Sequence, residues 1–216
     1  MEKKKVCVIA VHPDDETLGC GGTILKHLSK GDDVYCIFVT SGNEDQAILI
    51  ENVSNQYGFT KHFNLDFPEL ELSDISLNKI IPKIALIFSE IKPQVLYIPN
   101  RSDVHSDHRQ VFDAVFSCTK TFRYPYIEKI LMMEVISETD FSPSISDCAF
   151  IPNYFVDITD AFKRKIEILK TYESELLPNP QTRNESSLTA LNRYRGSQIG
   201  CEYAESFVLL KEINRM

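Results

Sequence analysis

The stretch VCVIAVHPDDE, residues 6–16, joins a short apolar run to a histidine, a proline and three carboxylates. The run from Val6 to Val11 is uniformly apolar and rich in β-branched residues, which is typical of a strand buried on both faces of a parallel sheet. In open α/β sheets, ligands bind beyond the carboxyl ends of the strands. Pro13 also favours an extended backbone at His12. The polar residues after the run are therefore a candidate site at a strand end.

Carboxylates before a helix also have a simpler interpretation. Asp14, Asp15 and Glu16 precede a helix-like segment. Acidic side chains at a helix N-terminus cap free N–H groups and suit the helix dipole. Taken alone, the stretch therefore favours capping about as strongly as a functional site.

Composition limits the class of protein. The chain has 216 residues, of which 43% are hydrophobic and 25% charged. These values predict one globular domain, residues 1–216, with a substantial core. The net charge of −8 argues against a nucleic acid partner, because no basic patch is available for phosphates.

The N-terminal segment and the cysteines bear on location. The basic residues 1–5 precede an apolar run of only about six residues, which is too short for a signal peptide or a membrane span. The six cysteines are scattered without CxxC spacing, which favours reduced thiols and argues against a cysteine-type zinc site. We therefore expect a cytoplasmic protein without membrane insertion.

Strand and helix patterns alternate along the chain, which implies parallel βαβ units. The predicted fold class is a single α/β, Rossmann-like domain with a mainly parallel sheet flanked by helices. Pro82 is expected to delay the start of the helix at 77–92 or to kink it. Besides the first strand, we expect strands at 33–40, 62–68, 94–99, 129–135, 154–158 and 206–210. We expect one helix that ends near residue 30, and further helices at 46–58, 77–92, about 106–121, 160–176 and 188–195.

Three glycines, Gly19, Gly21 and Gly22, follow the acidic cluster. Their spacing is not GxGxxG, and the nearby carboxylates would repel a pyrophosphate. We expect them to allow close backbone packing and not to bind a dinucleotide.

A second strand end carries the same types of residue, in NRSDVHSDHRQV, residues 100–111. His105 and His108 are three residues apart, so at a helix start they can face one cleft. Histidines that occur alone in such a loop are most often caps or surface residues. Together with the first strand end, however, His12, Asp15 and His108 offer two nitrogens and one oxygen. This is a catalytic zinc arrangement, and it also suits iron(II) or another divalent metal.

The two motifs, residues 12–16 and 105–108, resemble the signature of the LmbE-like or PIG-L family of zinc-dependent de-N-acetylases. The resemblance spans most of the chain and implies an α/β fold with its site at the carboxyl edge of the sheet. Supporting matches lie at residues 40–42, 65–68, 195–196, 200 and 203–207.

The resemblance implies a role for each motif residue. His12, Asp15 and His108 are expected to ligate zinc, which lowers the pKa of bound water toward ~7. Asp14 is expected to be the general base that relays the proton of this water. His105 is expected to stabilise the tetrahedral oxyanion or to protonate the leaving amine.

Residues around the motifs have two possible kinds of role, supporting a metal ligand or contacting the substrate. Asp107 and Asp103 are candidate partners that hold a histidine tautomer, and capping of the following helix explains them about equally well. Many family members carry a substrate-contacting arginine early in the helix after the second strand, whereas this chain has Gln46 near that position. Arg101 and Arg193 are candidate replacements.

The expected reaction is hydrolysis of the N-acetyl group of an amino-sugar derivative, which releases the amine and acetate. A sugar conjugate, glycan precursor or nucleotide-linked sugar is favoured over a membrane lipid as the small-molecule substrate, because the chain is acidic and lacks a membrane segment. The alternatives are a zinc amidase acting on a non-sugar N-acyl compound and a metal-binding protein without turnover. A homo-oligomer is compatible with the sequence.

Overall fold

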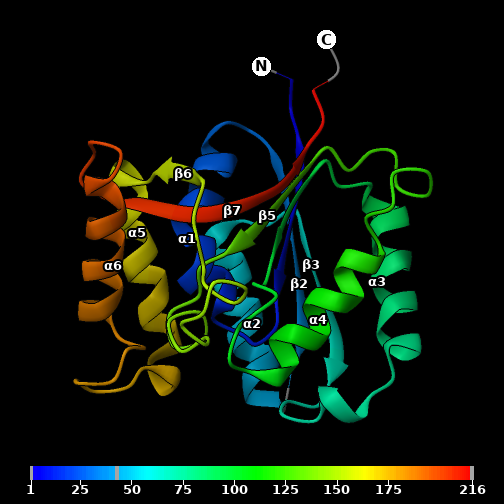
Figure 1. Cartoon of the computed structure of the whole chain (residues 1–216), viewed down its shortest axis with the longest axis horizontal. Coiled ribbons are helices and arrows are strands. Elements are labelled where there is room, and N and C mark those ends of the chain that lie inside the picture. The colour runs from blue at the N-terminus through cyan, green and yellow to red at the C-terminus, as the bar shows by residue number, and fades with distance from the viewer. Residues whose placement is uncertain (1, 42–43, 215–216) are drawn as a thin grey trace.

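The computed structural model describes residues 2–41 and 44–214, so Gly42 of the 40–42 match lies outside the described residues. A seven-stranded sheet lies at the centre of the fold (Figure 1). Its strands are β1 (Lys5–Ala10), β2 (Asp33–Thr40), β3 (Lys61–Phe67), β4 (Val95–Ile98), β5 (Lys129–Met133), β6 (Tyr154–Asp157) and β7 (Ala204–Glu212). They are arranged in the order β3-β2-β1-β4-β5-β7-β6.

The sheet is mainly parallel. The strands from β3 to β5 in this order are parallel, and β7 runs antiparallel to both β5 and β6. Strand β1 has a hydrogen-bonded neighbour on each side. Its side chains alternate between two core clusters, with Val6 and Val8 in one and Cys7 and Ile9 in the other. The predicted α/β fold with a mainly parallel sheet is confirmed.

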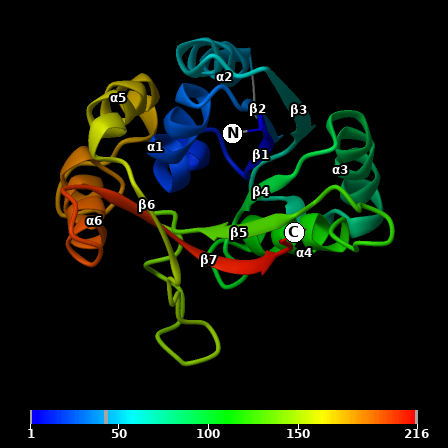
Figure 2. The ribbon, with the colours of Figure 1, turned by 90° about the horizontal axis from the view of Figure 1, so that it is seen from above.

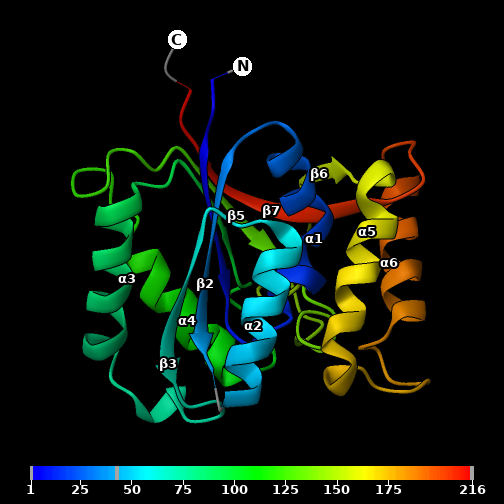
Figure 3. The same ribbon diagram turned by 180° about the vertical axis from the view of Figure 1, so that it is seen from behind.

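Helices cover both faces of the sheet. Within the described residues, they are α1 (Asp15–Ser29), α2 (Glu44–Tyr57), α3 (Leu77–Ile91), α4 (Ser106–Ser117), α5 (Thr159–Leu169) and α6 (Glu185–Ser197), with short 3₁₀ turns at Leu72–Asp74 and Lys170–Glu175. Figure 2 shows α1, α2, α5 and α6 on one face and α3 and α4 on the other, and Figure 3 shows the same layers from behind. None of these helices is both long and apolar enough to cross a membrane.

Some helix boundaries differ from the sequence-based expectation. Helix α3 has the expected span, and it begins at Leu77, so Pro82 does not delay its start. Helix α4 ends at Ser117, before the expected end near residue 121. The side chain of Ser76 caps the helix by accepting from the Asn78 N–H, and an apolar stripe buries α3 against the sheet. Helix α5 ends earlier than expected, at Leu169, because the chain continues as a 3₁₀ turn.

Helix α1 is kinked at Cys20, which has a non-helical backbone (φ −148°, ψ 22°). The kink leaves the N–H groups of residues 22–23 free to donate to the Glu205 carboxylate at 2.8 and 2.7 Å. The freed carbonyl of Leu18 accepts from Lys165 Nζ at 3.1 Å, and Lys165 pairs with Glu205 at 2.7 Å. A fully buried ion pair thus replaces the helical hydrogen bonds that the kink removes.

Gly22 provides the close packing expected of the glycines. A Cβ atom at this position would lie 2.7 Å from Cβ of Ile158 and 2.8 Å from Cδ1 and Cγ2 of the same side chain. We expect Gly22→Ala to lower the free energy of unfolding by about 1–3 kcal/mol, because overpacking outweighs the gain in helix propensity. Urea denaturation measures this, with Ser29→Ala at the exposed end of α1 as the control. The cost should shrink when Ile158 is shortened to alanine. An equal cost in both backgrounds would contradict the steric explanation.

The strand order places the predicted site at the point where the chain changes direction across the sheet. From β1 the chain moves to β2 and β3 on one side, and it returns with β4 on the other side of β1. Ligands of such sheets bind at the carboxyl ends of the strands beside this switch point. His12 follows β1, and residues 105–108 follow β4, so both motifs reach the same edge.

Candidate metal centre and active site

The three predicted metal ligands meet at this edge. Oδ2 of Asp15 lies 3.3 Å from Nε2 of His108 and 3.9 Å from Nδ1 of His12. One potential ligand atom from each residue lies within 4.8 Å of the others. A tetrahedral zinc ion with bonds of about 2.0 Å separates its ligand atoms by about 3.3 Å. The spacing of these donors therefore fits such an ion.

His108 carries the clearest sign of a missing partner. Its side chain is fully buried, and its Nδ1 lies 2.9 Å from Oδ2 of Asp103. Its buried Nε2 makes no well-formed hydrogen bond within residues 2–41 and 44–214, although Oδ2 of Asp15 lies 3.3 Å away. Burial lowers the pKa of His108, but Asp15 and Asp103 outweigh this effect and raise it well above its usual value. A cation held by Nε2 would satisfy both the unpaired nitrogen and the nearby negative charge.

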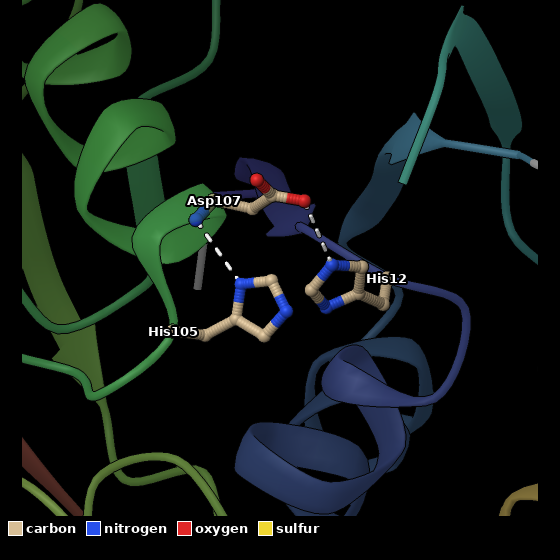
Figure 4. Close-up of side chains that lie close together, drawn as sticks. All are labelled: His12, His105 and Asp107. Atoms are coloured by element: carbon tan, nitrogen blue, oxygen red, sulfur yellow. Dashed lines mark hydrogen bonds and ion pairs between the residues drawn. The ribbon is translucent and has the colours of Figure 1, made fainter. Parts of the chain in front are cut away.

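A second carboxylate orients His12. Nε2 of His12 lies 3.4 Å from Oδ2 of Asp107, and a dashed line marks this contact in Figure 4. The Asp107 carboxylate also accepts the backbone N–H groups of Leu70 at 2.8 Å and Leu72 at 3.3 Å. Each histidine of the predicted set thus has one nitrogen directed at a carboxylate and the other directed toward Asp15. Carboxylates in this position fix the ring orientation of metal-binding histidines.

A second donor cluster, His12, His105 and Asp107, is also compact enough to hold a metal. In this cluster, however, the Asp107 carboxylate already accepts two backbone N–H groups. Nδ1 of His105 accepts from the Asp107 N–H at 3.1 Å (Figure 4). The set with His108 fits a metal better because it contains the unpaired buried nitrogen.

Capping does not explain the four aspartates in and beside the two motifs. Asp14 is the N-cap residue of α1, but its side chain makes no capping hydrogen bond. The Asp15 carboxylate accepts from the His12 N–H at 2.8 Å and not from the helix. At α4 the capping side chain is His105, so neither Asp103 nor Asp107 serves that purpose.

Asp14 has an unusual backbone. Its φ of 128° is rare for any residue other than glycine and costs about 1–3 kcal/mol, a strain that often occurs at functional sites. Its carboxylate is buried, with Oδ2 3.3 Å from Nη1 of Arg183. Burial and the nearby Asp15 raise the pKa of Asp14, while Arg183 opposes the rise.

A cavity of about 190 Å³ opens beside these groups. Its lining combines an imidazole pair with carboxylates and one guanidinium, from His12, Pro13, Gln46, Glu69, Leu70, His105, Glu138, Glu175 and Arg183. Larger hollows of about 390 and 450 Å³ lie elsewhere, and none of the motif residues His12, Asp14, Asp15, His105 and His108 lines them. Volume alone therefore does not identify the site.

His105 faces this cavity as a neutral donor. Burial and the neighbouring His12 lower the pKa of His105. Because its Nδ1 accepts from the Asp107 N–H, the proton of the neutral ring is on Nε2. The ring can therefore donate one hydrogen bond to a bound molecule.

The arginine at the cavity is not one that the sequence suggested. The Arg101 guanidinium donates to the carbonyl of Asp147 at 2.8 Å, and Arg193 donates to the hydroxyl of Tyr203 at 3.0 Å. Neither lines the cavity, whereas Arg183 does. Arg183 belongs to an irregular segment with no motif, so no sequence pattern marked it. Gln46 does lie at the cavity, as its place in the resemblance implied.

Asp103 should strengthen metal binding through His108. Asp103→Asn is expected to weaken metal affinity about 10- to 100-fold, because the ring loses its anionic partner. Asn100 and Thr139 also donate to the Asp103 carboxylate, and an asparagine amide would disturb these bonds. Competition with a chromogenic chelator measures the affinity, and Asp113→Asn on the exposed face of α4 is the control. Unchanged affinity in Asp103→Asn would contradict the orienting role.

Known proteins resemble this chain in sequence and in fold. The family model described as PIG-L, GlcNAc-PI de-N-acetylase, matches residues 7–119. Diacetylchitobiose deacetylase of Thermococcus kodakarensis is 27% identical over 223 residues, which cover 94% of this chain and 81% of that protein. The N,N'-diacetylchitobiose deacetylase of Pyrococcus horikoshii, solved with an inhibitor, has a TM-score of 0.76 at 22% identity, covering 97% of this chain and 85% of that one.

The fold alone does not determine the reaction. GalB of Pseudomonas putida KT2440, a 4-carboxy-2-hydroxymuconate hydratase, has a TM-score of 0.73 at 14% identity, covering 99% of this chain and 98% of that one. The family assignment rests instead on the sequence match, which includes both histidine motifs and more than half of the 216 residues. The chain therefore belongs to the PIG-L family, as those motifs indicated.

Proposed function

We propose that this protein is a zinc-dependent hydrolase that removes the acetyl group from an N-acetylated amino-sugar derivative. The observation that carries the proposal is the compact set of His12, Asp15 and His108, in which the buried Nε2 of His108 makes no hydrogen bond to any described residue and faces Asp15 at 3.3 Å. The relatives support the reaction, because those found by sequence include deacetylases of N-acetylated sugars. They favour it over a non-sugar amidase or a protein without turnover.

The metal would be held by His12 Nδ1, Asp15 and His108 Nε2, and iron(II) suits the same donors. When bound, zinc polarises the amide carbonyl and lowers the pKa of water in its open position. Asp103 and Asp107 would keep the two rings in place through their carboxylates.

Asp14 and His105 would move and stabilise charge. Asp14 accepts a proton from the attacking water and delivers it to the amide nitrogen, so the C–N bond breaks to give the amine and acetate. His105 donates from Nε2 to the carbonyl oxygen as negative charge develops there. Its ring is already fixed by the Asp107 N–H, so little reorganisation is needed.

We also propose a cytoplasmic location. All six cysteines are free, and four of them are buried. This pattern is typical of a reducing compartment.

The first experiment measures acetate release from a panel of N-acetylated sugars, with metal content assayed on the same sample. Release should stop with a chelator and return with zinc. Protein that contains stoichiometric zinc but releases no acetate from any sugar would contradict the proposed reaction. Protein that binds no metal would contradict the ligand set.

A further inference from the structure

We propose that Glu138 and Arg183 bind hydroxyl groups of the substrate and select a neutral N-acetylated sugar. This inference rests on the proposed function and names its recognition residues. Both side chains line the same cavity as His12 and His105. Neither belongs to the two histidine motifs.

Each of these residues presents an unsatisfied atom. Oε2 of Glu138 and Nε of Arg183 are both buried, and neither has a hydrogen-bond partner among the residues that the structure describes. Leaving such groups unpaired is costly. In the described part of the chain, no ion pair joins these two side chains, although each lies within the electrostatic influence of the other. A hydroxyl group is the simplest partner for both, because it donates to a carboxylate and accepts from a guanidinium.

The backbone holds Glu138 firmly. The preceding residue, Ser137, has a φ of 78°, which is rare for serine. The Glu138 carbonyl accepts from the Val104 N–H at 3.2 Å, and the Thr139 hydroxyl donates to Asp103 at 2.8 Å. The segment that carries Glu138 is thus bonded to the same aspartate that orients His108. A fixed carboxylate loses little entropy when it binds a ligand.

Arg183 is also held in place. Its guanidinium lies 3.3 Å from Asp14 and 3.9 Å from Glu175, and its carbonyl accepts from the Leu177 N–H at 2.8 Å. Arg183 thus places a cation at the cavity from the irregular segment before α6. The arginine expected in many family members would instead lie near position 46, in α2. Because Arg183 also contacts the proposed base, it can link substrate binding to the reacting centre.

The charge around the cavity favours a neutral ligand. Glu69, Glu138 and Glu175 line it, against the single cation Arg183. Burial raises the pKa of Glu138, but Glu69 and Glu175 outnumber Arg183 even if Glu138 is protonated. The two charges of a divalent metal are matched by Asp15 and by Asp107, whose carboxylate lies 3.4 Å from His12. A phosphate would be repelled, so we infer a neutral sugar in place of the nucleotide-linked sugar that the sequence left open.

The test compares substrates that differ by one hydroxyl. The zinc-loaded wild type and Glu138→Gln are assayed on the methyl glycoside of N-acetylglucosamine and on its 3-, 4- and 6-deoxy analogues. We expect Glu138→Gln to lower kcat/KM on the full sugar about 10- to 100-fold. On one deoxy analogue the same substitution should have little effect, because the bond is already absent. Glu173→Gln, at an exposed position, is the control, and zinc content is measured for each variant.

Arg183→Lys extends the test, because it keeps the positive charge beside Asp14 but removes Nε. Arg183→Lys should lower kcat/KM on the full sugar by a similar factor. On the deoxy analogue that lacks the bound hydroxyl, it should change kcat/KM little. N-acetylglucosamine 1-phosphate should be a substrate at least tenfold poorer than the methyl glycoside. Turnover of the phosphate at an equal rate, or equal losses on every analogue, would overturn the inference.

Failure of the inference differs from failure of the proposed function. In the first case the wild type releases acetate and the variants show no preference among the deoxy analogues. In the second case the zinc-loaded wild type releases no acetate from any sugar.

Discussion

Replacing Asp14 by asparagine is expected to lower kcat by about 10²- to 10⁴-fold and to leave the metal bound. The substitution removes the carboxylate that is proposed to carry the proton from water to the amide nitrogen. It leaves His12, Asp15 and His108 intact, so metal content should not change. KM should change less than kcat, because Asp14 acts on the proton and not on the sugar.

Asparagine is the right replacement because of the backbone. Asp14 has a φ of 128°, and asparagine tolerates positive φ better than most residues. Its side-chain oxygen can still accept from Arg183. A matched control is Asp113→Asn, which makes the same chemical change on exposed α4. Full hydrolysis by zinc-loaded Asp14→Asn would show that another group is the base.

The largest expected effect on stability comes from Lys165→Met. Lys165 and Glu205 are paired at 2.7 Å with side chains 0% and 1% exposed. Removing the lysine leaves the Glu205 carboxylate buried without a counter-charge, and it also removes the donor to Leu18 at the kink of α1. We expect a loss of about 3–5 kcal/mol in the free energy of unfolding.

Chemical denaturation measures this loss, and two further variants make the result specific. Lys170→Met breaks an exposed pair with Glu185, whose side chains are 60% and 51% exposed, so it should cost no more than about 1 kcal/mol. The double variant Lys165→Met with Glu205→Gln should be less destabilised than Lys165→Met alone, because no charge remains buried. Equal losses in the single and double variants would show that packing, and not charge, sets the cost.

Strong local patterns made the fold predictable. The apolar run at Val6–Val11 and the similar runs before residues 40 and 99 are strands, as expected, because buried parallel strands need unbroken apolar sequence. The span of α3 was predicted correctly, but Pro82 does not delay its start, because a single lost hydrogen bond is outweighed by burial of the helix face. The end of α5 was missed for a similar reason, since Tyr172 turns inward to donate to Glu16 at 2.9 Å.

The candidate site was predictable only where sequence neighbours share it. His12, Asp14 and Asp15 lie within four positions, and His105 and His108 lie within four others, so their types and spacing pointed to a metal. Glu138 and Arg183 reach the cavity from irregular segments that follow β5 and the 3₁₀ turn at Lys170–Glu175. Which polar residue of an irregular segment turns inward depends on tertiary packing, and no local periodicity records it.

The position of the two recognition residues along the chain has a consequence for how such enzymes can diversify. The match to the family model ends at residue 119 and contains the whole proposed metal set together with Asp14 and His105. Glu138 and Arg183 lie beyond it. Most of the reaction centre and part of the cavity wall would then be inherited on one stretch of the gene, and two recognition residues on a later one. Of the two, position 138 is the better place to alter selectivity, because Arg183 also contacts the proposed base Asp14. Exchanging these later segments between relatives is therefore a direct way to seek new substrates.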